Sequence, residues 1–207
     1  MSVSSDIVEV GASFFRRGLT FGRTGNLSAV DTDGSIVMTP TGVSLDHLGR
    51  GELSRVDRDG HHIAGPPPTK ESFLHLALYR ARPNAGAVVH THSTYSVAVS
   101  CLRNIDTSNA LPVLTAYYAM RVGALPVLPY HAPGDESLGP AAESAAEAHH
   151  ALLLANHGPV VASADLATAA DALEEIEETA KLYLLLRGSA VNPVTDQEAR
   201  RLNGLYR

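Results

Sequence analysis

Apolar and polar positions recur along the chain with two different periods, and the period indicates which segments form helices and which form strands. Between residues 5 and 18, apolar side chains recur every three or four positions, which predicts an amphipathic helix that ends at Gly18. A second helix is predicted to begin with Thr69 as its N-cap and to stop at Pro83. Further helices are predicted from Ser93 or Thr94 to Cys101, over 136–150, and from Ser163 to Gly188.

Short apolar runs bounded by turn residues predict the strands. Asp31-Thr-Asp-Gly34 and Asp57-Arg-Asp-Gly60 each separate two such runs, so each predicts a hairpin. Other strands are predicted over 85–92, 113–119, 125–128 and 151–155, the last resuming at 160–161. Early hairpins followed by strand–helix units predict a mixed α/β protein, and the length suits a single domain.

The composition narrows the set of partners. Apolar residues make up 44% of the chain, charged residues 18%, and the net charge is −6, so a basic surface for nucleic acid is not expected. The apolar runs are shorter than the roughly 20 residues that span a bilayer, and the N-terminus lacks the pattern of a signal peptide. We therefore expect no nucleic-acid partner, no membrane partner and a cytoplasmic location.

Two features are expected to be structural only. The single cysteine, Cys101, has small and apolar neighbours, which predicts a buried, inert thiol in a reducing compartment. The acidic run over 174–178 is expected to be a solvated helix face, on which Glu177 pairs with Lys181 one turn later.

Three histidines at predicted strand ends indicate a metal site. His90 and His92 are two positions apart on one predicted strand, so their side chains point to the same face. His157 follows another apolar strand and precedes Gly158. Each histidine alone is compatible with an ordinary structural role, but three together suit a catalytic Zn²⁺ with an open position, and Mn²⁺ or Co²⁺ would also bind them.

A candidate base and three candidate anion sites complete the set. Glu71 lies in the first turn of a predicted helix, where the helix dipole would stabilise a carboxylate even without catalysis. Small polar turns offer backbone N–H groups to a phosphate. These turns are Gly25-Asn26, Thr41-Gly42 and Thr69-Lys70, and Lys70 is either a cation of the site or a solvated side chain.

The order and spacing of these motifs resemble the class II aldolase/adducin family over roughly residues 7–187. The matching segments are Gly25-Asn-Leu-Ser28, Thr39-Pro-Thr-Gly42, Pro68-Thr-Lys-Glu71, Val89-His-Thr-His92 and Asn156-His-Gly158. The resemblance implies one domain over 1–207, with a three-layer α/β/α fold and a central, mainly antiparallel mixed sheet. It also implies a zinc-dependent homotetramer with active sites between subunits.

The resemblance also implies roles for individual residues. His90, His92 and His157 correspond to zinc ligands, and Glu71 to an acid/base that also ligates zinc in the empty enzyme. The positions that correspond to phosphate-binding residues are Asn26, Thr41, Gly42 and Thr69. A tyrosine from a neighbouring subunit is implied as well. Tyr117 and Tyr118 both lie near the expected place, Tyr118 is predicted to be the catalytic one, and Tyr206 is a candidate for a second such tyrosine.

Within the family, the chain is most similar to the 3-oxo-tetronate 4-phosphate decarboxylase branch. Lys70 replaces the Ser or Gly that usually precedes the glutamate in fuculose- and rhamnulose-type aldolases, and the segments 112–123 and 129–135 also suit this branch. The implied reaction gives dihydroxyacetone phosphate and CO₂ through a zinc-stabilised enediolate. Lys70 would bind substrate and orient the leaving carboxylate, a role that Arg23 or Arg121 could share.

Three alternative functions remain open at this stage. One is a sugar-phosphate aldolase of the fuculose, rhamnulose or ribulose phosphate type, or an epimerase of the same family. Another is a non-catalytic scaffold like the adducin head, although the histidines and the glutamate are all present. A zinc hydrolase is the third, but the sequence lacks a His-Glu-x-x-His motif.

Overall fold

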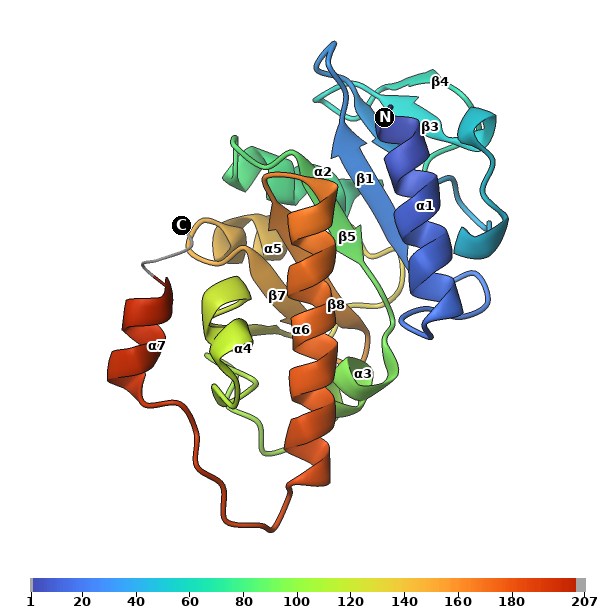
Figure 1. Cartoon of the computed structure of the whole chain (residues 1–207). Coiled ribbons are helices and arrows are strands. Elements are labelled where there is room, and N and C mark those ends of the chain that lie inside the picture. The colour runs from blue at the N-terminus through green and yellow to red at the C-terminus, as the bar shows by residue number, and fades with distance from the viewer. Residues whose placement is uncertain (1, 204–207) are drawn as a thin grey trace.

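An eight-stranded mixed sheet forms the centre of the protein (Figure 1). The structure, a computed structural model, describes residues 2–203. The strand order is β4-β3-β2-β1-β5-β8-β7-β6, and every neighbouring pair is antiparallel except β6 and β7, which are parallel. The strands are β1 (Asn26–Val30), β2 (Ile36–Met38), β3 (Ser54–Val56), β4 (His62–Ala64), β5 (Ala87–His90), β6 (Val127–Leu128), β7 (Ala151–Leu154) and β8 (Gly158–Ser163).

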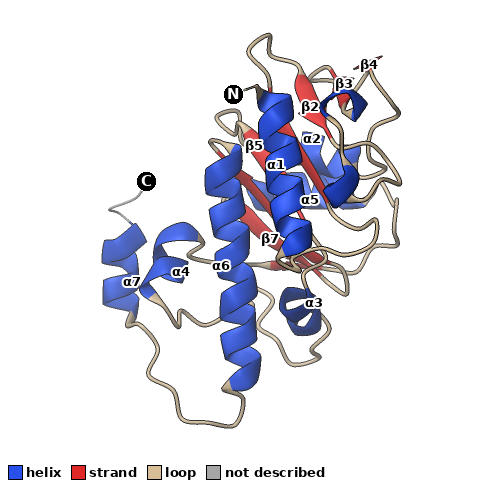
Figure 2. Ribbon diagram, turned by 45° about the vertical axis from the view of Figure 1, so that its right-hand side comes forward, coloured by secondary structure: helices blue, strands red, loops and turns tan. Residues whose placement is uncertain are grey.

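Helices cover both faces of this sheet (Figure 2), so the predicted three-layer α/β/α fold class is confirmed. On one face lie α2 (Ser72–Ala81) and α5 (Leu138–Ala146). The other face packs against α1 (Val3–Arg16), α3 (Thr94–Ser100), α4 (Ala116–Arg121) and α6 (Leu166–Leu185). The last helix, α7 (Asp196–Asn203), packs on α4, and short 3₁₀ turns occupy Leu45–His47 and Arg50–Glu52.

The central strand β5 shows how the two layers share the sheet. Ala87 and Val89 belong to the core beneath α1 and α6, whereas Val88 belongs to the core beneath α2 and α5. Successive side chains of a strand point to opposite faces, so a strand covered on both faces is apolar throughout. The same strand pairs His90 with Asn26 of β1 and with Val160 of β8, which brings three chain segments together at one end of the sheet.

Some predicted elements differ in the structure. Residues 113–119 were predicted as a strand, but α4 begins at Ala116 because the Thr115 hydroxyl caps it by accepting from the Tyr118 N–H at 3.1 Å. The long helix α6 is capped by Asp165 rather than by Ser163, which is the last residue of β8. The helix α7 was not predicted from the sequence.

The predictions for Glu177 and Cys101 are wrong. Glu177 is only 6% exposed, and its carboxylate accepts the backbone N–H groups of Tyr95 and Ser96 at 2.9 and 2.8 Å. It therefore satisfies the start of α3 instead of pairing with Lys181, whose ammonium lies 3.9 Å from Glu178. Cys101 is exposed, because it is the C-cap residue that follows the last residue of α3, Ser100, at the protein surface.

None of the helices within residues 2–203 combines the length and the apolar character needed to cross a bilayer.

Candidate metal and active site

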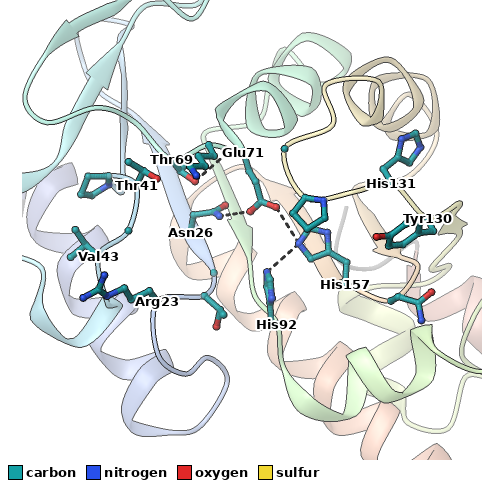
Figure 3. A pocket seen from close by; sticks show the side chains of 18 residues that line it. Arg23, Asn26, Thr41, Val43, Thr69, Glu71, His92, Tyr130, His131 and His157 are labelled. Atoms are coloured by element: carbon teal, nitrogen blue, oxygen red, sulfur yellow. Dashed lines mark hydrogen bonds and ion pairs between the residues drawn. The ribbon is translucent and has the colours of Figure 1, made fainter.

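An open pocket of about 520 Å³ lies at the end of the sheet where β1, β5 and the β7–β8 turn meet (Figure 3). Loops from distant parts of the chain form its wall, and Glu71, His92 and His157 lie at its base. The lining segments are 23–26, 40–43, 69–71, 130–131, 133–134 and 156–157, together with His92.

The three predicted histidines converge at this base. His157 Nε2 lies 3.1 Å from His92 Nε2 and 3.3 Å from His90 Nε2. The ring centroids are 4.6 to 5.0 Å apart. Nitrogen donors of His90, His92 and His157 and a carboxylate oxygen of Glu71 all lie within 4.8 Å of one another, so the donor set fits one Zn²⁺ ion.

Backbone contacts orient two of the rings. His90 Nδ1–H donates to the Pro159 carbonyl at 2.8 Å, which leaves the unprotonated Nε2 facing the other two rings. His157 is placed by a close approach of two backbones at the next residue. A Cβ on Gly158 would come within 2.3 Å of the Thr91 carbonyl oxygen, and its φ of +147° also excludes most side chains. Only glycine therefore lets the turn carrying His157 pack against the segment carrying His92.

Burial keeps the His90 and His92 rings neutral. Burial lowers the pKa of His90 to about 4, and that of His92 to about 3, where the neighbouring rings contribute further. Both rings are therefore uncharged at pH 7. Neutral imidazoles are the form that binds a metal ion, so the site needs no deprotonation of these rings before it takes up a cation.

Glu71 faces the histidines from the start of α2. Its Oε1 lies 3.1 Å from His157 Nε2, and Asn26 Nδ2–H donates to Oε2 at 2.6 Å (Figure 3). Its Oε2 also lies 3.6 Å from His90 Nε2. Burial alone would raise the pKa of Glu71, but His90, His157 and the Asn26 hydrogen bond outweigh it and hold that pKa below its ordinary value. Because His90 is uncharged at pH 7, the hydrogen bonds from Asn26 and His157 are the contacts that favour the carboxylate there.

The residues predicted to bind phosphate all line the pocket. Thr41, Gly42, Thr69 and Lys70 form the wall beside Glu71, and the Thr69 hydroxyl accepts the Glu71 N–H at 3.3 Å. Thr69 therefore lies two residues before the N-cap position of α2, which Glu71 occupies, and is not itself that N-cap. Asn26 is 5% exposed, and its bond to Glu71 leaves one amide N–H for a ligand.

The prediction that Tyr118 reaches a neighbouring subunit is wrong. Its side chain is fully buried in the core of its own chain, beneath α6. The adjacent Tyr117 is 58% exposed and is the tyrosine of this pair that a second chain could contact. Tyr206 lies outside the described residues.

The pocket wall includes one of the two predicted arginines and two residues that were not predicted. Arg121 lies away from this pocket and pairs with Asp171 at 3.0 Å, whereas Arg23 does line it. Tyr130 and His131, which the sequence reading did not single out, also line it (Figure 3). Their segment, Pro129-Tyr-His-Ala-Pro-Gly134, carries turn residues that could have indicated a pocket loop.

Comparison with known proteins agrees with this arrangement. The family model described as the class II aldolase and adducin N-terminal domain matches residues 5–184. The chain is 45% identical to 3-oxo-tetronate 4-phosphate decarboxylase of Haemophilus influenzae, over 95% of this chain and 93% of that protein. It is 32% identical to L-fuculose phosphate aldolase of Escherichia coli K12, over 88% of this chain and 82% of that protein.

A solved structure is similar over almost the whole chain. YgbL from Klebsiella pneumoniae superimposes with a TM-score of 0.94 at 42% identity, covering 97% of each chain. This chain belongs to the class II aldolase and adducin family. The predicted relationship to decarboxylases and aldolases that act as carbon–carbon lyases is thereby confirmed.

Proposed function

We propose that this protein is a metal-dependent lyase that converts 3-oxo-tetronate 4-phosphate into dihydroxyacetone phosphate and CO₂. The observation that carries the proposal is the convergence of His90, His92, His157 and Glu71 at the base of a pocket walled by small polar turns and Lys70. Relatives named for this decarboxylation, 43 to 45% identical to the chain, support it.

His90, His92 and His157 would hold the cation through their Nε2 atoms. Zinc, when bound, supplies a Lewis acid for the negative charge that develops on substrate oxygen as the carboxylate leaves. Breaking the C1–C2 bond releases CO₂ and leaves its electron pair on the remaining three-carbon phosphate, so one proton from solvent must reach C2. Glu71 borders the pocket with Oε1 directed toward His157, and we assign it to carry that proton.

The pocket wall would hold the two anionic ends of the substrate. Thr41, Gly42 and Thr69 offer hydroxyl and backbone donors to the phosphate, and Asn26 offers its remaining N–H. Lys70 adjoins Glu71 in the wall and supplies a cation for the substrate carboxylate, which an aldolase substrate lacks.

We further propose a single class II aldolase-type domain that assembles into a homotetramer with active sites between subunits. The pocket is open to solvent beside Tyr130, which is 62% exposed, so a second chain could complete its wall. The exposed Tyr117 is our candidate for the side chain that a neighbour contributes.

An assay of CO₂ release tests the proposed reaction. Purified protein, with its metal content measured by elemental analysis, is incubated with 3-oxo-tetronate 4-phosphate and separately with L-fuculose 1-phosphate. We expect CO₂ and dihydroxyacetone phosphate from the first and little cleavage of the second. Aldol cleavage of the fuculose phosphate without CO₂ release from the first substrate would instead support the sugar-phosphate aldolase, the alternative favoured by the 32% identical relative.

Replacement of Lys70 by serine should separate decarboxylation from folding. Loss of a charge-assisted hydrogen bond to the carboxylate corresponds to about 1.5–3 kcal/mol, so kcat/KM for decarboxylation should fall about 10- to 100-fold. The free energy of unfolding, measured with urea, should change by less than about 0.5 kcal/mol. Lys181→Ser is the matched control, because Lys181 lies on α6 outside the pocket. An unchanged kcat/KM in the Lys70 variant would remove this residue from the mechanism.

A further inference from the structure

A line of buried polar side chains runs from Glu71 into the layer between the sheet and α2. Asn26 donates to Glu71 Oε2 at 2.6 Å, and Asn26 Oδ1 lies 2.5 Å from His75 Nε2. His75 Nδ1 lies 2.7 Å from Ser28 Oγ, which in turn lies 2.9 Å from Tyr79 Oη. We call Asn26, His75, Ser28 and Tyr79 the polar chain.

Two pairs of sequence positions build the polar chain. Asn26 and Ser28 are two apart on β1 and therefore share a face of the sheet, whereas His75 and Tyr79 are four apart on α2 and share a face of the helix. Ser28 and His75 are 0% exposed, so water does not compete for their hydrogen bonds. Polar groups buried this deeply require their partners, which makes the pattern of donors and acceptors specific.

Only one direction of hydrogen bonding satisfies every member. An ionised carboxylate only accepts, so the NH₂ end of Asn26 must face Glu71 and its carbonyl oxygen must face His75. That oxygen also only accepts, so His75 must carry a proton on Nε2. Burial lowers the pKa of His75 to about 4, hence the ring has a single proton at pH 7. Its Nδ1 is then an acceptor and takes the hydrogen bond from the Ser28 hydroxyl.

We propose that Ser28 and His75 are positioning residues. Ser28 fixes the tautomer of His75, and His75 in turn fixes the orientation of the Asn26 amide. The amide then holds Glu71 Oε2, which leaves Oε1 to transfer the proton. The opposite tautomer would present an acceptor to Asn26. The Asn26 amide would then turn its NH₂ group toward His75 and its oxygen toward Glu71. In the structure the amide nitrogen lies 2.6 Å from Glu71 Oε2, so an oxygen in that place would repel the carboxylate. The role given to Oε1 rests on the proposed function, in which Glu71 carries the proton. The predicted tautomer of His75 does not depend on that function.

Replacement of Ser28 by alanine tests the proposal, because it removes the donor to His75 Nδ1. In the wild-type protein, ¹⁵N NMR of the histidine rings should show His75 as the pure Nε2–H tautomer. In Ser28→Ala we expect a mixture with the Nδ1–H form and a fall in kcat of about 10- to 100-fold, the usual effect of losing such a supporting contact, with KM changed far less. Ser5→Ala is the control, since Ser5 is a buried serine on α1 and should leave tautomer and kcat unchanged.

Variants of His75 give a second comparison. The side-chain N–H of glutamine can replace Nε2–H as donor to Asn26, whereas leucine cannot, so His75→Gln should retain a kcat at least about 10-fold above that of His75→Leu. Equal kcat values for these two variants would overturn the proposal, as would an Nδ1–H tautomer in the wild type or unchanged turnover in Ser28→Ala. If the wild type released no CO₂, the proposed function would fail, but the tautomer would still decide whether the polar chain has the stated direction.

Discussion

Replacing His157 by alanine is expected to abolish both metal binding and turnover. The His157 ring contacts both other rings, with its Nε2 at 3.1 Å from His92 Nε2 and 3.3 Å from His90 Nε2, and it also contacts Glu71 Oε1 at 3.1 Å. Without it, the site loses one of its three imidazole donors, and the Glu71 carboxylate loses its contact with that ring. A metal contribution of several kcal/mol to the barrier corresponds to a fall in kcat of about 1000-fold or more.

The measurement is the zinc content per chain after dialysis, by elemental analysis, together with the CO₂-release rate. His47→Ala is the control, because His47 is exposed on a 3₁₀ turn outside the pocket, where it pairs with Asp46. The control should keep wild-type zinc content and rate. Retention of full zinc occupancy and full rate in His157→Ala would contradict the site as proposed, because His157 is there both a metal ligand and a partner of Glu71.

The histidine cluster shows what the sequence can predict. Two histidines with one residue between them point to the same side whenever the backbone is extended. The strand β5 ends at His90, two residues earlier than predicted, yet Thr91 N–H still bonds to the Pro159 carbonyl at 3.3 Å, so the pairing continues one residue beyond the strand. Alternation alone was therefore sufficient for this pair. The approach of His157 depends on β8 pairing antiparallel with β5, which follows from the sheet topology and was predictable here only through the family resemblance.

Contacts between distant helices could not be predicted in this way. In the run Glu174, Glu175, Glu177 and Glu178, helical spacing places Glu177 on the apolar stripe of α6, four residues after Leu173. The N–H groups at the start of α3 that satisfy its buried carboxylate could not be identified from the sequence of α6. Tyr117 and Tyr118 present the same difficulty. They are adjacent on α4, yet one is 58% exposed and the other is fully buried, and only the packing of α4 against α6 decides which is which.

The same limit explains why His75 was not recognised. Its neighbours Leu74 and Leu76 are buried and apolar, so the histidine looks like an interruption of a core face. The partners that make it functional in our proposal, Asn26 and Ser28, lie 49 and 47 residues away on β1. The fold and the convergence of the three histidines could thus be predicted from local patterns and family motifs, whereas the contacts supporting Glu71 required the packing of α2 on the sheet.

Replacing Glu71 by glutamine is expected to leave the metal in place and remove turnover. Glutamine has the same shape, and its side-chain oxygen can accept from Asn26 Nδ2 at the position of Oε2, so the polar chain keeps its partner. Its NH₂ group then lies where Oε1 was and cannot take up a proton. Loss of a positioned acid/base corresponds to a fall in kcat of about 100- to 10,000-fold.

Zinc content and kcat measured on the same preparation separate this outcome from that of the histidine variant. His90, His92 and His157 are all retained, so we expect close to wild-type zinc content in Glu71→Gln and a rate near background. Loss of zinc along with activity would mean that Glu71 acts chiefly as a ligand, whereas normal turnover would exclude it as the group that moves the proton. The contrast between His157→Ala and Glu71→Gln therefore distinguishes two kinds of metal site. In one, the carboxylate is only a neighbour of the metal ligands; in the other, Asn26 holds one oxygen of Glu71 and the carboxylate performs the proton transfer.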